Sequence, residues 1–433
     1  MATNVASLSV PEEIAAAVIL PESYESFETV TLPAAAWLRE NMPVGRAEVP
    51  GYDPLWILSR HAEISEVLKD AKRFHNADFN PILETRSSDD FTRSINGGST
   101  RIFDSMSYMD PPEHPSYRKV LAKKFEPSVV RAEYEERFRQ LAVELVEEFM
   151  SIEGECDFIA DFATHYPVRV TMSLIGVPPE DHMRMLTLTK EFFGGADPDT
   201  QREEFKGLDD APARQWAAAT AEFQSFFQEL REQRAIAPED DLTTFANTLL
   251  TTEGSPWPDR IKNSFLATIA PAGIDTTVSA IASGMHGMIR YPDQWSLVKE
   301  RPELIPGLVN ESLRWATPTK TFMRNATSDT SIGGVPVMAM DRIVNLLFSG
   351  NRDAEVFPDP DRFDITRNAT RHLSFGFGAH RCLGQHIATT EMRILFEELL
   401  PRLRSVELVG EPQRERSSLV SGLKTLPIRF QKA

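Results

Sequence analysis

Residues 374–384, Ser-Phe-Gly-Phe-Gly-Ala-His-Arg-Cys-Leu-Gly, place a single cysteine, Cys382, in a glycine-rich segment that leads into a helical pattern. The only other cysteine is Cys156, and the two stand in no CxxC, CxxCH or zinc-type spacing. Glycines let the backbone approach a large flat cofactor closely. A helix N-terminus and cationic neighbours favour the thiolate, which is the form of cysteine that binds metal. The segment therefore indicates a thiolate ligand to a planar apolar cofactor. The alternative, an inert buried cysteine, fits Cys156.

The segment resembles, position for position, the haem-binding signature of the cytochrome P450 family of haem-thiolate monooxygenases. The matching positions are Phe375, Gly378, His380, Cys382 and Gly384. The resemblance implies haem b as cofactor, with Cys382 as iron ligand and Phe375 and Gly376 beside the haem. It also implies a mainly α fold with a smaller β part, formed as one domain over residues 1–433. In that fold the haem lies between a long central helix and the cysteine loop.

The bulk composition is that of a soluble globular protein with a large core, because 41% of the 433 residues are hydrophobic and 25% are charged. The 46 basic and 64 acidic residues give a net charge of −18, which disfavours nucleic acids and anionic membranes as partners. The apolar run 14–20 is much shorter than the roughly 18 residues that span a bilayer. Without a disulfide framework, the expected location is the cytoplasm. We expect a monomer with no fused reductase.

Helical periodicity predicts helices over residues 129–150, 259–290, 303–314 and 385–400. The pattern over 259–290 is nearly free of charge in its middle, which is typical of a helix in the core of a large domain. Short β patterns occur over residues 52–58, 330–337, 343–348 and near Val406 and Ile428. The polar stretches 76–100 and 194–208 read as long loops. The resemblance places the first over the haem and the second near the substrate entrance.

Asp275 and Thr276 stand within the long apolar pattern, where a carboxylate is unfavourable unless it is paired or hydrated. The dipeptide also occurs at residues 199–200 and 329–330, so it is not specific by itself. The resemblance matches this copy to the family's acid–alcohol pair, which implies a proton relay. The alternative is a salt-bridged Asp275 beside a packing threonine.

Pro271 lies four residues before Asp275. A proline within a helix removes one hydrogen bond and clashes with the carbonyl four residues earlier, here Ala267. A hydrogen bond from Thr276 to the Ala272 carbonyl would add to the bend. We therefore expect the helix to open or kink here, next to the small Gly273, and to form a groove for dioxygen and water.

Glu311 and Arg314 form an ExxR pair, a spacing that residues 136–139 and 411–414 also satisfy. The resemblance singles out the copy at 311–314, and Arg362 in the following FPDPDRF segment is expected to complete a three-membered ion network. The implied role is structural. Removal of one partner of a buried ion pair costs about 3–5 kcal/mol.

Haem carboxylates need cationic partners, and arginine binds carboxylates in a bidentate manner. The resemblance assigns this role to four residues, His114, Arg118, Arg324 and His380. Of the three HxxxR spacings, at 114–118, 165–169 and 286–290, only the first stands in the matching MDPPEHPSYR context. The alternative for each residue is a solvated surface charge.

Basic residues gather near the first of these spacings: Lys119, Lys123, Lys124 and, beside the cysteine, Arg381. One interpretation is a docking surface for an acidic electron donor, with attraction that weakens in salt. The other is an ordinary solvated helix face.

The resemblance extends over nearly the whole chain and is strongest to a soluble bacterial branch of the family, the α-terpineol monooxygenases. It departs at Pro271 and over residues 190–260. It implies a small apolar substrate, a terpenoid or alkyl-aromatic compound of the terpineol, limonene or cymene type. The expected pocket residues are Phe103, Met106, Thr268, Ala272 and Thr319, with plain core packing as the alternative.

The implied reaction is hydroxylation of an activated C–H bond with O2 and two electrons. The electrons would come from NAD(P)H through a reductase and an iron–sulfur ferredoxin. One alternative is a peroxide-dependent peroxygenase, which the intact Asp275-Thr276 pair disfavours. Another is a non-catalytic haem-based binding or sensor protein, which needs no proton relay. Hydrophobic pockets discriminate by only about 1–3 kcal/mol per methylene, so the sequence does not select among such substrates.

Overall fold

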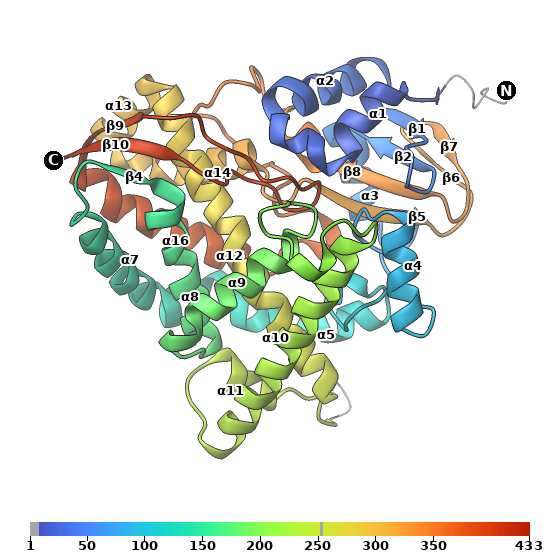
Figure 1. The fold of residues 1–433 in the computed structure, drawn as a ribbon, viewed down its shortest axis with the longest axis horizontal. Helices are drawn as coiled ribbons and strands as arrows, with labels where there is room; N and C mark the ends of the chain where they lie inside the picture. Colours follow the sequence, from blue (N-terminus) through green and yellow to red (C-terminus); the bar gives the residue numbers. More distant parts are fainter. Residues whose placement is uncertain (1–7, 252–253) are drawn as a thin grey trace.

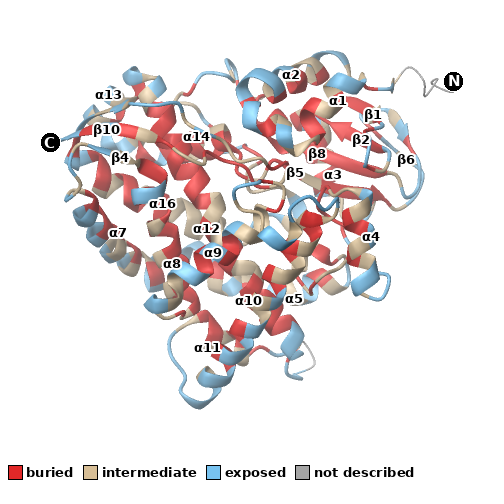
Figure 2. Cartoon of the chain, viewed as in Figure 1, coloured by how far each residue is buried: buried red, intermediate tan, exposed pale blue. Residues whose placement is uncertain are grey.

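A long helix, α12 (Asp259–Arg290), runs through the molecule, and α8, α9, α10, α14 and α16 pack against it (Figure 1). The structure is a computed structural model that describes residues 8–251 and 254–433. Most residues of α12 are buried, as expected for a nearly uncharged helix (Figure 2). Within the described residues, α12 alone is long and apolar enough to cross a membrane, and 67% of its most apolar window is buried in the protein. That burial is typical of a core helix.

The remaining α-helices are mostly short or of medium length. They are α1 (Glu12–Ile19), α2 (Leu32–Asn41), α3 (His61–Lys69), α4 (Arg86–Ile95), α5 (Glu113–Leu121), α6 (Pro127–Val129), α7 (Glu135–Phe149), α8 (His165–Ile175), α9 (His182–Phe193), α10 (Ala211–Ile236), α11 (Leu242–Asn247), α13 (Pro292–Glu300), α14 (Ile305–Ala316), α15 (Leu347–Gly350) and α16 (Gln385–Leu399). The largest core cluster joins α7, α8, α12, α14 and α16 through buried aliphatic and aromatic side chains.

Strands form a smaller part of the fold, and those in the described part of the chain are arranged in three sheets. The five-stranded sheet has the order β1 (Val44–Ala47), β2 (Leu55–Leu58), β8 (Arg342–Leu346), β5 (Thr321–Ala326), β3 (Phe74–His75). The pair β2–β8 is parallel, and the other pairs in this sheet are antiparallel. The three-stranded sheet has the order β4 (Glu155–Asp157), β10 (Pro427–Lys432), β9 (Leu403–Leu408), and the third sheet is the hairpin β6 (Thr330–Ile332), β7 (Val335–Val337). The fold is mainly α with a smaller β part, as predicted.

Two predicted segments differ from the structure. The stretch 76–100 is not one loop, because α4 occupies its second half. The helix predicted over 129–150 is divided into α6, a π-helical turn at Val130–Tyr134, and α7. The predicted ends of α12 are confirmed, whereas α14 lies two residues later than expected.

The helix opening predicted at Pro271 is not seen. α12 is one α-helix from Asp259 to Arg290 and includes Pro271. The expected hydrogen bond from the Thr276 hydroxyl to the Ala272 carbonyl is present, at 2.8 Å. Neighbouring helices packed along α12 support it at a residue that cannot donate a backbone hydrogen bond.

Candidate active site

A cavity of about 340 Å³ lies between α12 and the segment that carries Cys382. One wall comes from α12, through Thr268, Ile269, Ala272, Gly273 and Thr276, and the facing wall includes Phe375, Gly376, Cys382 and Leu383. The volume lies within the roughly 300–1,000 Å³ range of ligand pockets. The sequence expectation that a cofactor lies between the long helix and the cysteine loop thus has a matching cavity.

The cysteine loop is shaped by two glycines with positive φ, Gly376 at 64° and Gly378 at 69°. A Cβ on Gly378 would lie 2.3 Å from the carbonyl oxygen of Leu68 in α3, so the loop packs directly on that helix. The Cys382 N–H donates to the Phe375 carbonyl at 2.7 Å and closes the loop just before α16 begins. The loop therefore presents Cys382 in a fixed orientation.

Asn351 anchors the start of this loop, a role that the sequence reasoning missed. Its side-chain oxygen accepts the Leu373 N–H at 2.6 Å, and its amide donates to Ser374 Oγ at 3.0 Å. Ser374 Oγ donates in turn to the Leu313 carbonyl in α14 at 2.7 Å. Asn351 is fully buried. Its position in a loop far from the cysteine in sequence gave no periodic signal that could reveal it.

Burial raises the pKa of the Cys382 thiol. Backbone N–H groups at Gly384 and Gln385 and the charges of Arg118 and Arg381 act in the opposite direction. The exposed surface of Cys382 faces the cavity. A bound metal cation would add a much larger charge at this sulfur and would favour the thiolate outright. Cys156 lies half-buried in β4, where burial and two aspartates raise the pKa of its thiol to about 12, consistent with an inert role.

Four further cavity residues form a cationic, hydrogen-bond-donating end: His114 and Arg118 from α5, Arg324 from β5, and His380 from the cysteine loop. The two imidazole rings lie 4.1 Å apart, centroid to centroid. The Nε2 atoms of His114 and His380 are buried without a hydrogen-bond partner among the described residues. Burial and neighbouring arginines lower the pKa of His114 to about 4 and that of His380 to about 2.

Arg118 and Arg324 also form no ion pair with any residue in 8–251 or 254–433. Arg324 donates to the Met323 carbonyl at 2.6 Å, and Arg118 donates to the carbonyl of Arg381. Burial lowers the pKa of Arg324 to about 10. Arg324 is buried and Arg118 is half-buried, and a buried cation without a carboxylate is unfavourable unless an anion joins it. Two arginines and two unsatisfied imidazole nitrogens therefore fit the two carboxylates of a haem.

Asp275 and Thr276 line different cavities, although both were expected at the oxygen site. Thr276 lines the large cavity, whereas Asp275 lines a smaller cavity together with Lys190 and Glu415. Adjacent residues of an α-helix point about 100° apart, which explains the division. Burial and the Glu415 charge raise the pKa of Asp275 to about 8.

Glu391 of α16 is a buried carboxyl group on the cavity wall that the sequence reasoning also missed. It accepts a hydrogen bond from Thr277 Oγ1 at 3.3 Å, and its Oε2 has no partner within the described part of the chain. Burial raises the pKa of Glu391 well above its usual value, which favours the neutral form. A glutamate on the otherwise apolar face of α16 was the available signal.

The ion network around Glu311 differs from the prediction in its third member. Glu311 and Arg314 are fully buried and form a bidentate pair with both N–O distances 2.7 Å. The expected third member, Arg362, instead pairs with Asp293 at the surface, 2.5 Å away. Arg367 contacts Glu311 at 3.4 Å and takes the predicted place. The Arg362 carbonyl accepts hydrogen bonds from both Arg314 and Arg367, so only its backbone joins the network.

Four of the five expected pocket residues, Met106, Thr268, Ala272 and Thr319, line the large cavity. Phe103 does not. It is buried in a separate cluster with Ile82, Tyr108 and Trp216. The sequence did not indicate several apolar residues of the wall: Phe125, Leu242, Trp257, Ile261 and Phe265. Among them Trp257 packs edge-on against Tyr117, with ring centroids 4.6 Å apart.

A cysteine that faces a cavity under a long helix, with two arginines at one end, is the arrangement that a haem-thiolate protein requires. The family model described as cytochrome P450 matches residues 49–431. The chain belongs to the cytochrome P450 family, oxidoreductases that hold haem b through a cysteine thiolate.

Three similar proteins illustrate the relationship. Cytochrome P450-terp from Pseudomonas sp is 43% identical over 99% of this chain and 100% of its own length. Linalool 8-monooxygenase from Pseudomonas putida is 31% identical over 91% of this chain and 94% of its own. The crystal structure of CYP108D1 from Novosphingobium aromaticivorans DSM12444 is 36% identical, covers 98% of this chain and 100% of its own, and has a TM-score of 0.89.

Proposed function

We propose that this protein hydroxylates a small apolar terpenoid or alkyl-aromatic compound at an activated C–H bond, using O2 and two electrons from an iron–sulfur ferredoxin. The observation that carries the proposal is the apolar cavity beside Cys382. The similarity to cytochrome P450-terp and to a linalool monooxygenase favours a terpenoid within this class. When bound, the haem supplies activation of dioxygen, and its thiolate ligand favours O–O cleavage.

The cavity walls bind and orient the substrate mainly by excluding water. Trp257, Phe265 and Ile269 supply large apolar surfaces, and Ala272 leaves room near the centre of α12. Burial of apolar substrate surface contributes about 25 cal/mol per Å². Because the walls named here offer few polar groups to the substrate, the shape of the cavity determines which C–H bond of the substrate faces the haem.

Thr276 and Asp275 supply protons in this proposal. The Thr276 hydroxyl lines the cavity and donates its proton to the Ala272 carbonyl, so its oxygen can accept a hydrogen bond. To pass a proton on, the hydroxyl turns away from this carbonyl and takes up another proton in its place. Asp275 lies next to it and opens on a polar cavity. An acid whose pKa lies near the working pH can both release and regain a proton.

His114, Arg118, Arg324 and His380 hold the haem carboxylates in the same proposal. The Nε2 atoms of the two histidines are buried without partners, and the two arginines line the same cavity without an ion pair among the described residues. Electrons arrive at the face that carries Lys119 and Lys123, which are exposed. Lys124 forms an ion pair with Glu133 at 2.9 Å and contributes less free charge there. An acidic ferredoxin suits this face.

The test is a titration of the purified ferric protein with a panel of monoterpenes and alkylbenzenes, followed by product analysis with NADH, a reductase and a ferredoxin. We expect a shift of the haem spin state with at least one compound and a hydroxylated product from it. Ala272→Leu, which fills the cavity, should weaken binding about tenfold or more, since overfilling a packed site costs about 1–3 kcal/mol.

Three results would contradict the proposal. Reduction without conversion of any apolar compound would favour a binding or sensor protein. Turnover with hydrogen peroxide that equals turnover with the electron-transfer proteins would favour a peroxygenase. Unchanged binding in Ala272→Leu would place the substrate elsewhere.

A further inference from the structure

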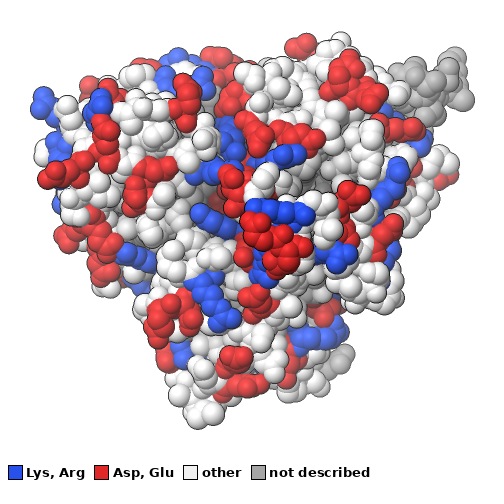
Figure 3. Space-filling model, viewed as in Figure 1, with Lys and Arg blue, Asp and Glu red and all other residues white. Residues whose placement is uncertain are grey.

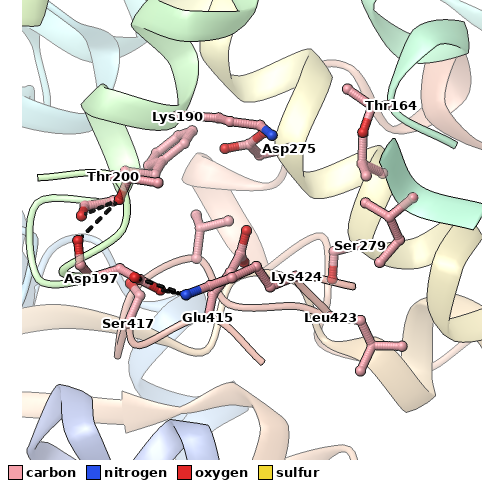
Figure 4. Close-up of a pocket in the computed structure, with 15 residues that line it drawn as sticks. Thr164, Lys190, Asp197, Thr200, Asp275, Ser279, Glu415, Ser417, Leu423 and Lys424 are labelled. Atoms are coloured by element: carbon pink, nitrogen blue, oxygen red, sulfur yellow. Dashed lines mark hydrogen bonds and ion pairs between the residues drawn. The ribbon is translucent and has the colours of Figure 1, made fainter. Parts of the chain in front are cut away.

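A second, smaller cavity of about 70 Å³ adjoins α12. It is lined by Asp275 and Ser279 of α12, by Lys190 and the segment after α9, and by Glu415 and Lys424 of the C-terminal segment (Figure 4). The view in Figure 3 shows acidic and basic side chains mixed around a hollow over the centre of the molecule. The segment 194–208, expected at the substrate entrance, thus lines this polar cavity through Gly194, Asp197 and Thr200.

One ion pair in this cavity is complete. Asp197 is buried and accepts hydrogen bonds from Lys424 Nζ at 2.8 Å and from the backbone N–H groups of Arg416 and Asp199, each at 3.0 Å. Lys424 also bonds Asp199 at 2.7 Å. These bonds hold the pKa of Asp197 low although burial acts the other way. Asp197 and Lys424 therefore neutralise one another.

The charges that remain do not balance. Asp275 and Glu415 both extend into the cavity, and Lys190 is the nearby cation (Figure 4). Lys190 is exposed and forms no ion pair within residues 8–251 and 254–433. Ionisation of both carboxyl groups beside a single solvated cation is unfavourable, because the two negative charges repel. The pair therefore tends to keep one proton.

Glu415 is held against α12 by its hairpin. Its Oε2 accepts the Gly422 N–H at 2.8 Å, and the Glu415 N–H donates to the Gly422 carbonyl at 3.1 Å. A Cβ on Gly422 would lie 2.5 Å from Ser279 Oγ, so only glycine allows this close approach. The position of Glu415 is therefore built into the fold rather than left to a mobile surface side chain.

Ser279 gives an independent indication that water occupies the cavity. Its side chain is 4% exposed, and its Oγ has no hydrogen-bond partner in the part of the chain that the structure describes. One water needs about 10–15 Å³ and two to four polar partners. A volume of about 70 Å³ with hydroxyl, carboxyl and ammonium groups beside apolar side chains such as Ile159 and Phe193 meets both conditions for water.

The electrostatics agree with a shared proton. Burial and the Glu415 charge raise the pKa of Asp275, and Lys190 opposes the shift. Burial also raises the pKa of Glu415, and Asp197 adds to the shift. The Gly422 hydrogen bond, Lys190 and Lys320 oppose it.

We propose that Asp275 and Glu415 share one proton in this cavity and that Glu415 resupplies Asp275 through water. In each cycle a proton leaves the Glu415 carboxyl, moves along water to the Asp275 carboxylate, and is replaced from solvent past Lys190; only O–H bonds form and break. The proposal rests on the proposed function, in which Asp275 supplies Thr276. Glu415 acts only through Asp275 and does not contact the substrate. It is therefore a positioning residue, which keeps a proton available to Asp275.

The first measurement is an infrared titration of carboxyl groups in the ferric, substrate-free holoenzyme. Glu415→Gln keeps the acceptor for the Gly422 N–H but removes a titrating group. We expect the Asp275 carboxyl band, assigned by its loss in Asp275→Asn, to titrate at lower pH in Glu415→Gln because a neighbouring negative charge is gone. An unchanged titration would overturn the coupling.

The second measurement is the fraction of electrons that reach product rather than peroxide, together with the solvent isotope effect. We expect coupling in Glu415→Gln to fall about tenfold, less than the roughly 10²–10⁴-fold of a positioned acid, since water still reaches Asp275. Glu411→Gln, exposed on the same segment, serves as the control and should match the wild type. Wild-type coupling in Glu415→Gln would overturn the proposal.

The two proposals fail in different ways. If the wild-type protein converts no terpenoid or alkyl-aromatic compound, the proposed function fails, while the infrared titration still decides the coupling of Glu415 to Asp275. If Glu415→Gln does not incorporate haem, Glu415→Asp replaces it. The shorter side chain keeps the charge but withdraws it from the cavity, and we expect a smaller shift and a smaller loss.

Discussion

Arg367 and Arg362 both follow the ExxR helix in sequence. Their positions in the sequence do not show which of them joins the ion network, but their surroundings in the structure do. Arg367 reaches Glu311 and donates to the Asp359 and Arg362 carbonyls, with its side chain 9% exposed. The Arg362 side chain is 43% exposed and pairs with Asp293. A solvated ion pair contributes about 0–1 kcal/mol, whereas loss of a buried partner leaves groups unsatisfied at about 1–3 kcal/mol.

The substitution pair Arg367→Met and Arg362→Met tests this assignment at single-residue scale. We expect Arg367→Met to lower the thermal midpoint of the holoprotein by several degrees and Arg362→Met to change it little. The measurement is thermal unfolding followed by circular dichroism and by loss of haem absorbance. Equal effects of the two substitutions would show that Arg362 stabilises the network after all.

Asp275 makes stability depend on pH. Its pKa is raised to about 8 in the folded protein by burial, above an unfolded value near 4. Between these values the folded state binds more protons than the unfolded state, so stability falls as pH rises. We expect Asp275→Asn to raise the thermal midpoint more at pH 8 than at pH 5. Asp209→Asn, an exposed control, should show no such difference. Parallel pH profiles for wild type and Asp275→Asn would contradict the raised pKa.

At the scale of elements, the cysteine loop depends on its contact with the end of α3. Gly378 has a φ of 69°, and its missing Cβ allows the Leu68 carbonyl to approach. Gly378→Ala should displace the loop and greatly reduce haem content, measured by the haem-to-protein ratio after purification. The control is Gly334→Ala. Gly334 has a similar φ of 82° but open space around it, so this substitution introduces backbone strain without a clash. Full haem content in Gly378→Ala would contradict this role.

α4 shows why one helix was not predicted. Its sequence, RSSDDFTRSI, has no apolar stripe, and its buried side chains are the polar Ser88, Asp89 and Thr92. Thr85 caps its first turn by accepting the Ser88 N–H, and Asp89 pairs with Arg342 of β8 at 3.2 Å. Hydrophobic periodicity detects helices that bury apolar faces, so a helix held by polar contacts escapes it.

α12 shows the opposite case. Both ends of this nearly uncharged helix were predicted correctly, because a helix that is apolar on every side is stable only in the core of a protein. The opening expected at Pro271 does not occur, because α12 continues through this residue with neighbouring helices packed along its length.

For the whole molecule, an acidic chain of net charge −18 carries a basic face at α5. Local charge, rather than net charge, steers an acidic partner within a Debye length of about 10 Å at 0.1 M salt. We expect Lys119→Glu with Lys123→Glu to slow reduction by a ferredoxin severalfold at low salt, with the difference vanishing at high salt. Stopped-flow reduction measures this difference.

The control is Arg404→Glu with Lys432→Glu, which makes the same charge change on the β9–β10 sheet. Equal slowing by both double variants would remove the basis for a docking face.

The site residues that belong to a continuous sequence motif could be predicted. The site residues that tertiary contacts bring into place could not. Cys382, Phe375 and Gly376 lie on the wall of the large cavity, as a continuous motif allows. Phe103 lies in another cluster, and Asn351, Glu391 and Glu415 reach their positions through contacts between segments distant in sequence. No spacing in the chain reports such contacts.

The central claim is a cysteine sulfur bound to haem iron, and carbon monoxide tests it most directly. The reduced wild-type protein treated with carbon monoxide should show the long-wavelength Soret band that gives the cytochrome P450 family its name. Cys382→His should retain haem but lose that band, while Cys156→Ser should keep it. A short-wavelength Soret band in the freshly purified wild-type protein, unchanged by Cys382→His, would contradict the account.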